Sequence, residues 1–391
     1  MNLHLAIDQK FILSFIERQE EFSDSKNKYV LFTNQESLIK ELDALEIVPM
    51  KVHSLTSVLK QFDDIKTIYF HGLTDFFQDL ILQLRLWEKY TLTWVFYGGE
   101  LFGSYKFYDT FLMTKSQGEH KKMYPEYYFK PSINPIQLRR NILNFKFYKN
   151  KLIEESNRME EAVKRIDYLA HFIYSDYEKY VLPISPNIKF IDWNYAINSK
   201  DKKVSRKKRE KTLILGNSAS IYNNHADALH FLKKNLKDGS EWSVLTPLSY
   251  NDRRGYGERI SNLGKTLFGE KFQPLTVFLP KNEYEQLISS ISAAVYFNLR
   301  SQAAGNIFWF IRQEIPVFLK KENSLYGFLK EIGITPLSVE EDLPLFLKNE
   351  HHISFELLKN NAENLAHFFS KERVGNAYQK LLSVDLKNDS N

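Results

Sequence analysis

The feature that most constrains this chain is a repeated switch between short strand-like runs and amphipathic helical stretches. In the first hundred residues, runs of about five β-branched or aromatic residues alternate with stretches such as 73–89, where apolar positions recur at helical spacing. Strands are expected at 2–6, 29–33, 47–52, 67–71 and 91–97, and again at 168–173 and 188–191. Strands that alternate with helices predict a parallel sheet covered on both faces.

A second alternating series begins at residue 211. Its expected strands are 212–215, 242–246, 275–278, 293–297 and 315–319, and the tail 354–382 has a helical pattern. The stretch 198–210 between the two series lacks apolar periodicity and is typical of a solvated connector. A chain of 391 residues has the length of two domains. We therefore predict an α/β protein with the following parts: a first domain at 1–197, a basic connector at 198–210, a second domain at 211–353 and a helical tail at 354–391.

Charge is unevenly distributed along the chain. Lys and Arg total 53 against 48 Asp and Glu, a net charge of +5. Residues 200–211 hold eight basic and two acidic side chains, and residues 101–151 hold ten and three, so the remainder is acidic. This distribution argues against a protein that coats nucleic acid. The 200–211 patch also lacks an aromatic residue that would stack on bases, so no nucleic-acid partner is expected.

The chain has no cysteine, which excludes disulfides, thiolate metal sites and a cysteine nucleophile. The N-terminal stretch carries Asp8 and Lys10 and does not resemble a signal peptide. Apolar runs reach about five residues, far below the roughly 20 that cross a bilayer. A cytoplasmic protein with at most peripheral membrane contact is expected.

Two junctions in the second domain have the character of ligand-binding loops. In 213–229, Gly216 ends a strand, Asn217 and Ser218 offer short polar side chains, and Asn223 or Asn224 is placed to cap the next helix. This is neither a dinucleotide fingerprint nor a Walker loop, and a plain structural turn also fits.

In 296–329, Arg300 precedes a helix opened by Gly305 and Asn306, which suits a diphosphate. Glu322 and Asn323 follow the next strand, where a carboxylate can bind a sugar hydroxyl or simply begin a helix. Because ligands of open α/β sheets bind at the carboxyl ends of the strands, we expect a small-molecule enzyme working between two lobes.

The first domain carries glycines and carboxylates at its expected strand ends. His71-Gly72 and Gly98-Gly99 follow two of the strands, and glycine allows close approach of a ligand to the backbone. Glu100 and Asp176 are candidates for a general base that deprotonates an acceptor hydroxyl, although capping or solvated roles fit each of them.

The segment 101–151 combines its basic charge with twelve aromatic residues among 51. Basic aromatic surface is attracted to anionic membranes. We expect Lys121, Lys122, Arg139 and Arg140 to contact such a surface. A helical hairpin with solvated charges is the alternative.

At these positions the sequence resembles one family, the TDP-N-acetylfucosamine:lipid II N-acetylfucosaminyltransferases of glycosyltransferase family 56. The family's H-G pair falls on His71 and Gly72, and its W-G-x-D-L turn falls on 97–101, with Tyr97 in place of Trp and Glu100 in place of Asp. Its G-N-S with N-x-H falls on Gly216, Asn217, Ser218, Asn223 and His225, and its P-x-x-Y falls on Pro247 and Tyr250. Its R-x-Q-x-x-G loop falls on Arg300, Gln302 and Gly305. Its I-P strand with a later E-N falls on Ile315, Pro316, Glu322 and Asn323. Asn306 stands where the family has Thr, and Ser249 and Ala303 stand where it has Gly.

The resemblance implies a GT-B fold, in which two Rossmann-like domains face a cleft. It implies a donor site made by Gly216, Asn217, Ser218, His225, Tyr250, Arg300, Gln302, Gly305, Asn306, Glu322 and Asn323. It also implies acceptor-side contacts from His71, Gly72, Gly98 and Gly99. The reaction it implies transfers a deoxyamino sugar from a TDP-sugar substrate to a lipid-diphosphate-linked saccharide, without a metal or other cofactor, at the inner face of the cell membrane.

Two other classes of function remain open from the residues alone. A GT-B transferase with another donor or a soluble acceptor fits the same motifs. A noncatalytic membrane adaptor would use only the 101–151 segment. Donor-dependent release of TDP distinguishes an enzyme from an adaptor.

Overall fold

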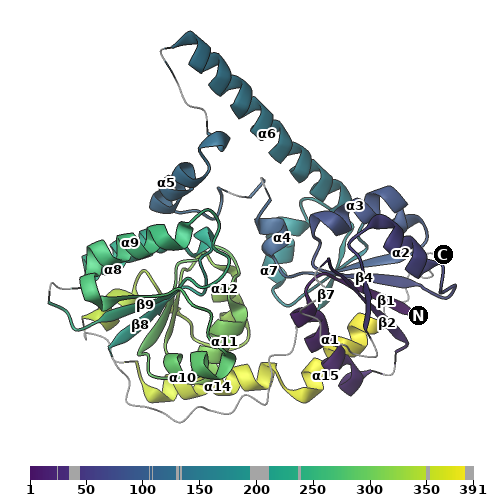
Figure 1. Ribbon diagram of the computed structural model, residues 1–391. Coiled ribbons are helices and arrows are strands. Elements are labelled where there is room, and N and C mark those ends of the chain that lie inside the picture. The colour runs from purple at the N-terminus through teal and green to yellow at the C-terminus, as the bar shows by residue number, and fades with distance from the viewer. Residues whose placement is uncertain are drawn as a thin grey trace. The chain divides into compact units, whose positions relative to one another are not determined.

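The computed structural model describes residues 1–23, 25–34, 45–104, 106–107, 109–128, 132, 134–193, 211–236, 239–348 and 353–383. The chain divides into two compact units. Unit 1 comprises Met1–Phe107, Leu152–Ile197 and Phe369–Asn391, and unit 2 comprises Tyr108–Lys151 and Asn198–Phe368. Each unit is built on one parallel β-sheet (Figure 1).

Unit 1 contains a seven-stranded sheet in the order β3-β2-β1-β4-β5-β6-β7, in which every described pairing is parallel. The strands are β1 (Asn2–Ala6), β2 (Asn27–Phe32), β3 (Leu45–Val48), β4 (Thr67–His71), β5 (Thr91–Val95), β6 (Tyr168–His171) and β7 (Lys189–Asp192). The helices are α1 (Gln9–Phe22), α2 (Val52–Leu59), α3 (Asp75–Leu84), α4 (Gly99–Phe102), α7 (Tyr174–Asp176) and α15 (Lys371–Leu382). Every residue of β4 and β5 is buried, as expected of central strands covered by helices on both faces.

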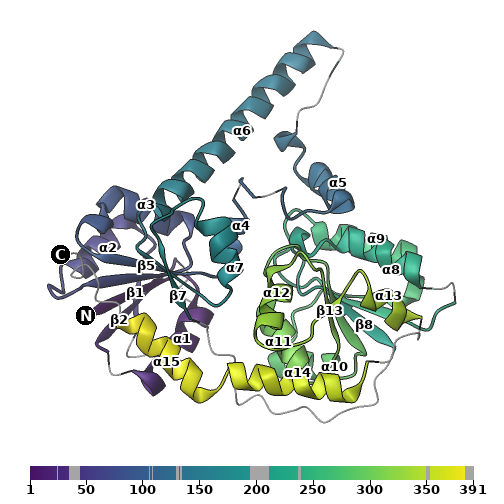
Figure 2. The same cartoon turned by 180° about the vertical axis from the view of Figure 1, so that it is seen from behind.

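The C-terminal helix α15 is part of unit 1, where it packs against α1 (Figure 2). Tyr378 of α15 lies against Phe15 of α1, with ring centroids 5.3 Å apart. Tyr69 of β4 donates a hydrogen bond of 2.7 Å to the Leu381 carbonyl. The end of the chain therefore completes the N-terminal unit. The domain scheme drawn from the sequence instead treats 354–391 as one tail.

Unit 2 contains a six-stranded sheet in the order β10-β9-β8-β11-β12-β13, again with parallel pairings throughout the described strands. The strands are β8 (Thr212–Leu215), β9 (Ser243–Pro247), β10 (Phe272–Leu275), β11 (Ala293–Tyr296), β12 (Val317–Leu319) and β13 (Leu337–Ser338). The helices are α5 (Thr114–Met123), α8 (His225–Asn235), α9 (Tyr256–Phe268), α10 (Lys281–Ile288), α11 (Ala304–Arg312), α12 (Ser324–Glu331), α13 (Asp342–Leu347) and α14 (Phe355–Phe368). The long helix α6 (Pro135–Val163) contributes residues to both units.

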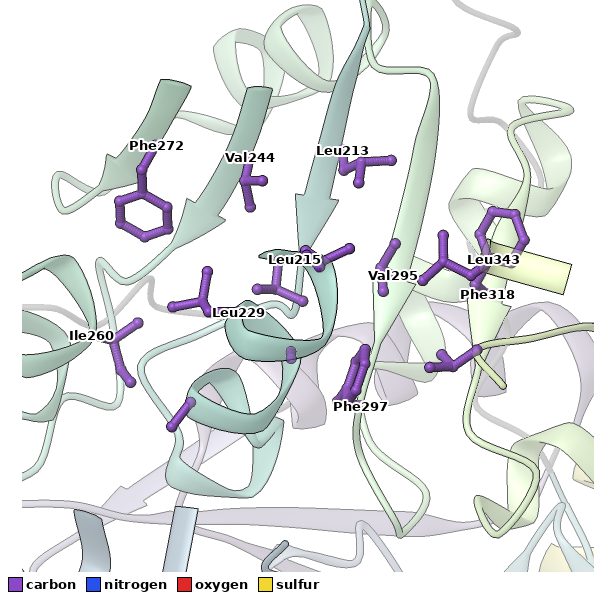
Figure 3. Packing of buried hydrophobic residues seen from close by; sticks show 14 of the residues in the cluster. Leu213, Leu215, Leu229, Val244, Ile260, Phe272, Val295, Phe297, Phe318 and Leu343 are labelled. Atoms are coloured by element: carbon purple, nitrogen blue, oxygen red, sulfur yellow. The ribbon is translucent and has the colours of Figure 1, made fainter. Parts of the chain in front are cut away.

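The core of unit 2 is formed where α8 and α9 cover one face of the sheet (Figure 3). Leu213 of β8 and Val295 of β11 are completely buried there, together with Leu229 of α8 and Ile260 of α9. Burying a side chain of this size contributes about 1.5–3 kcal/mol to stability. The packed layer therefore holds the strand ends, from which the loops begin.

The segment 109–128 joins unit 2 through α8, whereas the sequence places it in the first domain. Asp227 of α8 accepts hydrogen bonds from the backbone N–H groups of Lys115 and Ser116, at 3.0 and 2.8 Å. Met123, at the end of α5, is buried in the unit 2 core. A carboxylate that satisfies the free N–H groups at the start of α5 holds this segment on unit 2.

Two further expectations need correction or fall outside the structure. The strand predicted at 275–278 lies at Phe272–Leu275, and Val277 and Phe278 are 67% and 73% exposed. The predicted position of this strand was wrong because the last apolar residues of the run face solvent and lie beyond the strand. The predicted connector 198–210 lies outside the described residues.

Candidate functional site

The loops that follow β8, β9 and β11 are joined by side-chain hydrogen bonds at the carboxyl edge of the unit 2 sheet. The Asn217 amide donates to the Tyr250 hydroxyl at 2.9 Å and accepts from Gln302 Nε2 at 3.1 Å. Asn217 is buried, whereas Tyr250 is 48% exposed. Three residues singled out from separate motifs are therefore brought into one polar cluster.

Gly216 ends β8 with φ +69°, in the left-handed region that favours glycine. A Cβ at this position would lie 2.8 Å from His225 Nε2 and 3.0 Å from Asn223 Oδ1. His225 is completely buried, and burial lowers its pKa to about 3, so its imidazole is neutral at physiological pH. Its Nδ1 lies 3.3 Å from the Tyr256 hydroxyl. His225, the first residue of α8, therefore packs against the Gly216 turn.

Arg300 supplies a buried cation to the loop between β11 and α11. Arg300 is 7% exposed, and its Nη1 donates to the Ser301 carbonyl at 3.3 Å. Its guanidinium carbon lies 5.1 Å from the centroid of the Tyr222 ring. Burial raises the pKa of Tyr222 to about 12, so this phenol is neutral. A guanidinium held over an aromatic face suits a phosphate ligand.

Helix α11 begins at Ala304, four residues after Arg300. Ala303 precedes the helix with φ +60°, where the family has glycine, and the helix includes Gly305 and Asn306 as predicted. No atom outside the immediate chain lies within 4 Å of a Cβ built on Gly305. Free N–H groups at the start of α11 and the Arg300 guanidinium both favour a negatively charged ligand group.

Ser218, Asn223 and Asn323 brace these loops. Asn223 Nδ2 donates to the Ser218 carbonyl at 2.9 Å. Asn323 caps α12 by accepting from Leu325 N at 2.9 Å and donates to the Asn298 carbonyl at 3.1 Å. Glu322, in contrast, has a side chain that is 62% exposed and lies 3.6 Å from Lys320 Nζ.

The helix cap expected from Asn223 or Asn224 is not made. Asn224 precedes α8, but its side chain makes no cap hydrogen bond to that helix. Its Nδ2 instead donates to the Phe111 and Phe297 carbonyls, both at 3.0 Å, and its Oδ1 accepts from Met113 N at 2.8 Å. Asn224 therefore ties the 109–128 segment to the end of β11, a role that requires tertiary contacts.

Glu100 lies at the carboxyl edge of the unit 1 sheet, where the sequence analysis places a base. Its Oε1 accepts from Trp94 Nε1 at 3.0 Å and from Tyr97 N at 3.1 Å, so this oxygen anchors the turn after β5. Gly72 and Gly98 beside it have φ of +82° and +90°. Gly99 begins α4, and no atom outside the immediate chain lies within 4 Å of a Cβ built on it.

Asp176 is completely buried, and its Oδ2 lies 3.3 Å from His171 Nε2. A base must touch the hydroxyl that it deprotonates, so this burial argues for Glu100 over Asp176.

A buried histidine pair in unit 1 involves His4, a residue that the sequence analysis missed. His4 Nδ1 lies 3.1 Å from His71 Nε2, and His71 Nδ1 lies 3.2 Å from the Tyr97 hydroxyl. His71 is only 3% exposed, so its link to the protein surface runs through half-buried Tyr97. The available signal was a histidine inside an otherwise apolar strand.

The predicted membrane residues lie on α5 and α6. Lys122 is paired with Glu119 at 2.6 Å and Lys121 Nζ lies 5.5 Å from the Tyr128 ring centroid, whereas Arg139 and Arg140 are exposed on α6.

The N-terminal part of α6 also exposes apolar side chains that the sequence analysis did not single out. Ile136, Leu143 and Phe147 are 82%, 58% and 65% exposed, and their spacing of seven and four residues places them on one face of the helix. The residues of α6 that are buried begin only at Ser156. In the described part of the chain, no helix combines the length and apolar character needed to cross a bilayer.

Solved structures with the same two-sheet architecture show the fold of this protein. It is similar to the N-terminal domain of Candida albicans trehalose-6-phosphate phosphatase (TM-score 0.65, 9% identity, covering 98% of this chain and 96% of that one). It is also similar to sucrose-phosphate synthase from Thermosynechococcus elongatus (TM-score 0.62, 10% identity, 97% and 98% covered) and to WaaG, a glycosyltransferase involved in lipopolysaccharide biosynthesis (TM-score 0.55, 9% identity, 99% and 100% covered). The fold is GT-B.

The second half of the chain matches a known protein family. Residues 192–382 match the family model of the 4-alpha-L-fucosyltransferases, glycosyl transferase group 56. With the GT-B fold, this match shows that the protein is a glycosyltransferase. The match confirms the family predicted from the motifs. It includes the whole Asn217, Tyr250, Arg300 and Gln302 arrangement.

Proposed function

We propose that the protein transfers a deoxyamino sugar of the N-acetylfucosamine type from a TDP-sugar to a lipid-diphosphate-linked saccharide, in the synthesis of a surface polysaccharide. The observation that carries the proposal is the family match over 192–382 together with the clustering of the matched motif residues at one edge of the unit 2 sheet. The carboxyl edge of such a sheet is where α/β proteins bind nucleotides.

In this proposal, the donor diphosphate binds between Arg300 and the start of α11. The guanidinium and the helix N–H groups stabilise the charge that develops on the departing nucleotide diphosphate. Because these groups supply the positive charge, we expect transfer to proceed without a divalent metal. Tyr250 and Gln302 border the same cluster and contact the rest of the donor.

Glu100 is the proposed acceptor-side base if the reaction inverts the anomeric configuration. Its Oε1 is held by Trp94 and Tyr97, so the orientation of the carboxylate is fixed before the substrate binds. Preorganisation of this kind lowers the cost of placing the base beside an acceptor hydroxyl.

The proposed membrane-contacting surface is the exposed face of α6. Ile136, Leu143 and Phe147 would enter the head-group region while Arg139 and Arg140 meet anionic lipids. This surface would bring a soluble donor site to a lipid-linked acceptor at the inner face of the cell membrane.

The test is a transfer assay with purified protein, a short-chain lipid-diphosphate saccharide and a panel of TDP- and UDP-sugars, with the product identified by mass spectrometry. We expect transfer from TDP-N-acetylfucosamine that persists in EDTA and is abolished when the donor is omitted. Transfer only from a UDP-sugar would overturn the proposed donor class, and transfer only to a soluble saccharide would overturn the proposed acceptor class.

A further inference from the structure

A continuous chain of hydrogen bonds runs through the interior of unit 1 from Asn27 to Tyr97. Asn27 Oδ1 lies 3.3 Å from His4 Nε2, His4 Nδ1 lies 3.1 Å from His71 Nε2, and His71 Nδ1 lies 3.2 Å from the Tyr97 hydroxyl. The chain links strands β2, β1 and β4 to the turn after β5. Neither the family motifs nor the proposed mechanism explains it.

The direction of this series of hydrogen bonds is fixed at Asn27. Asn27 Nδ2 donates to the Ser25 carbonyl at 2.8 Å, so Asn27 Oδ1 is the acceptor in this amide. That oxygen also accepts from Asn2 Nδ2 at 3.0 Å. His4 Nε2 must therefore carry a hydrogen and donate it to Asn27.

The donor and acceptor roles of the next two residues follow because both imidazoles are neutral. Burial lowers the pKa of His4 to about 3, and burial together with the neighbouring His4 holds the pKa of His71 well below its ordinary value. A neutral imidazole has one N–H and one acceptor nitrogen. With its hydrogen on Nε2, His4 accepts at Nδ1 from His71 Nε2. His71 then accepts at Nδ1, and the Tyr97 hydroxyl is its donor.

Ring packing holds these orientations in place. The His4 ring stacks on Tyr69 with centroids 4.4 Å apart and planes 12° apart. Phe15 meets the His71 ring edge-on at 4.7 Å, and Phe11 stacks on Tyr97 at 4.6 Å. These contacts hold the ring planes in place, and the Asn27 acceptor determines which nitrogen carries the hydrogen.

We propose that Tyr97 accepts a hydrogen bond from a hydroxyl group of the saccharide acceptor, because its own proton is directed to His71. The inference rests on the proposed function for the identity of that ligand. Tyr97 is half-buried and follows β5 at the carboxyl edge of the unit 1 sheet, the edge at which open α/β sheets bind their ligands. An oxygen that presents only lone pairs favours a sugar hydroxyl and disfavours a phosphate or carboxylate. His4 and His71 are positioning residues that set this polarity.

The kinetic test is Tyr97→Phe in the transfer assay. We expect the KM for the saccharide acceptor to rise about 3- to 10-fold, the usual effect of losing one neutral hydrogen bond, with the KM for the donor unchanged. The matched control is Tyr177→Phe, because the Tyr177 hydroxyl donates to the Ile188 carbonyl at 2.8 Å in the same unit and faces no proposed ligand. Equal acceptor KM values for wild type and Tyr97→Phe would overturn the inference.

Acceptor analogues that each lack one hydroxyl identify the partner group. With the analogue that lacks the hydroxyl bound by Tyr97, the wild type and Tyr97→Phe should have the same KM for the acceptor. Additive losses for every analogue would mean that Tyr97 acts only on the fold.

The polarity itself is measured by ¹⁵N NMR of the histidine side chains in the full-length protein, which does not depend on activity. Both His4 and His71 should be Nε2–H tautomers. An Nδ1–H tautomer at His71 would overturn the proposal, because Tyr97 would then be free to donate. If the wild type transfers no sugar while both tautomers are as expected, the proposed function fails and the polarity of Tyr97 stands.

Discussion

Unit 2 offers a ligand a buried guanidinium, whereas unit 1 offers a carboxylate and a tyrosine oxygen at the same edge of its sheet. In unit 2, Arg300 and the start of α11 both favour negative charge. In unit 1, Glu100 and Tyr97 both present lone pairs, which favour hydroxyl donors. Two sheets of the same parallel design thus support opposite ligand chemistry.

This difference shows where substrate choice is encoded in a protein made of two similar domains. The sheets supply the position of the loops, and a few side chains after the strands supply their charge. The family match covers unit 2 loops and leaves most of unit 1 unmatched. We infer that the donor side follows the family pattern, while unit 1 departs from it at single positions, such as Tyr97 where the family has tryptophan.

The largest effect should come from the acceptor side of the comparison. Glu100→Gln should lower turnover about 100-fold or more, because the general base is lost, while TDP binding stays intact. Glutamine keeps an oxygen for Trp94 and Tyr97, so the turn should survive. Steady-state kinetics and TDP titration measure the two properties separately.

Asp176→Asn is the matched comparison for Glu100→Gln. Asp176 is buried beside His171, so this change should affect stability more than turnover. If Glu100→Gln keeps full turnover and Asp176→Asn loses it, the roles of the two carboxylates must be exchanged.

The next effect sharpens the donor side. Arg300→Ala should weaken TDP binding by roughly 1.5–3 kcal/mol, or about 10- to 150-fold, which is the usual contribution of hydrogen bonds to a charged group. Isothermal titration calorimetry on the folded variant measures this directly. Arg259→Ala, an exposed arginine on α9, is the control and should bind TDP normally. Unchanged affinity in Arg300→Ala would remove this residue from the donor site.

A third prediction concerns α6, which contributes to both units. Replacing Arg139 and Arg140 with Gln should reduce binding to anionic vesicles about 30-fold at low salt, since each charge near the surface contributes on the order of 1 kcal/mol. Replacing Lys121 and Lys122 should have a smaller effect, because Lys122 is paired with Glu119.

Vesicle co-sedimentation at two salt concentrations provides the measurement, with neutral vesicles for comparison. Phe147→Ser should remove the part of the binding that persists in high salt, because Phe147 is an exposed apolar residue of this face. Equal binding to anionic and neutral vesicles, or loss only when the basic residues of 200–211 are neutralised, would place the membrane surface elsewhere.

The last predicted effect concerns stability rather than activity, and is a change in its pH dependence. His4 has a pKa of about 3 in the folded protein against an ordinary value of 6.5, so the unfolded chain binds a proton that the folded protein does not. Stability is therefore lost as pH falls from about 6.5 toward 3, with a contribution of roughly 1.4 kcal/mol per pH unit from one histidine. His4→Phe should reduce the slope of unfolding free energy between pH 6 and pH 4 by this amount. An unchanged slope in urea titrations would contradict the burial of a neutral His4.

Periodicity predicted the parallel sheets well because buried strands require continuous apolar runs. The boundaries of β1, β4 and β8 match the expected ones exactly, whereas the two-residue strand β13 is too short to leave a pattern. Local motifs located the loops that form the donor cluster. Contacts between distant segments escaped prediction: Asp227 holds the start of α5, Asn224 binds Phe111, and His4 meets His71. Such partners are chosen by the folded arrangement and leave no spacing in the sequence.

Ligand-induced thermal stabilisation by TDP, compared across the wild type, Arg300→Ala and Tyr97→Phe, tests the division between the two units most directly. A ligand that binds the folded state raises stability by RT ln(1 + [L]/Kd), so the shift in Tm reports affinity in each variant. We predict that TDP raises the Tm of the wild type and of Tyr97→Phe equally, and raises that of Arg300→Ala much less. An unchanged shift in Arg300→Ala together with a lost shift in Tyr97→Phe would place the nucleotide on unit 1 and contradict the account.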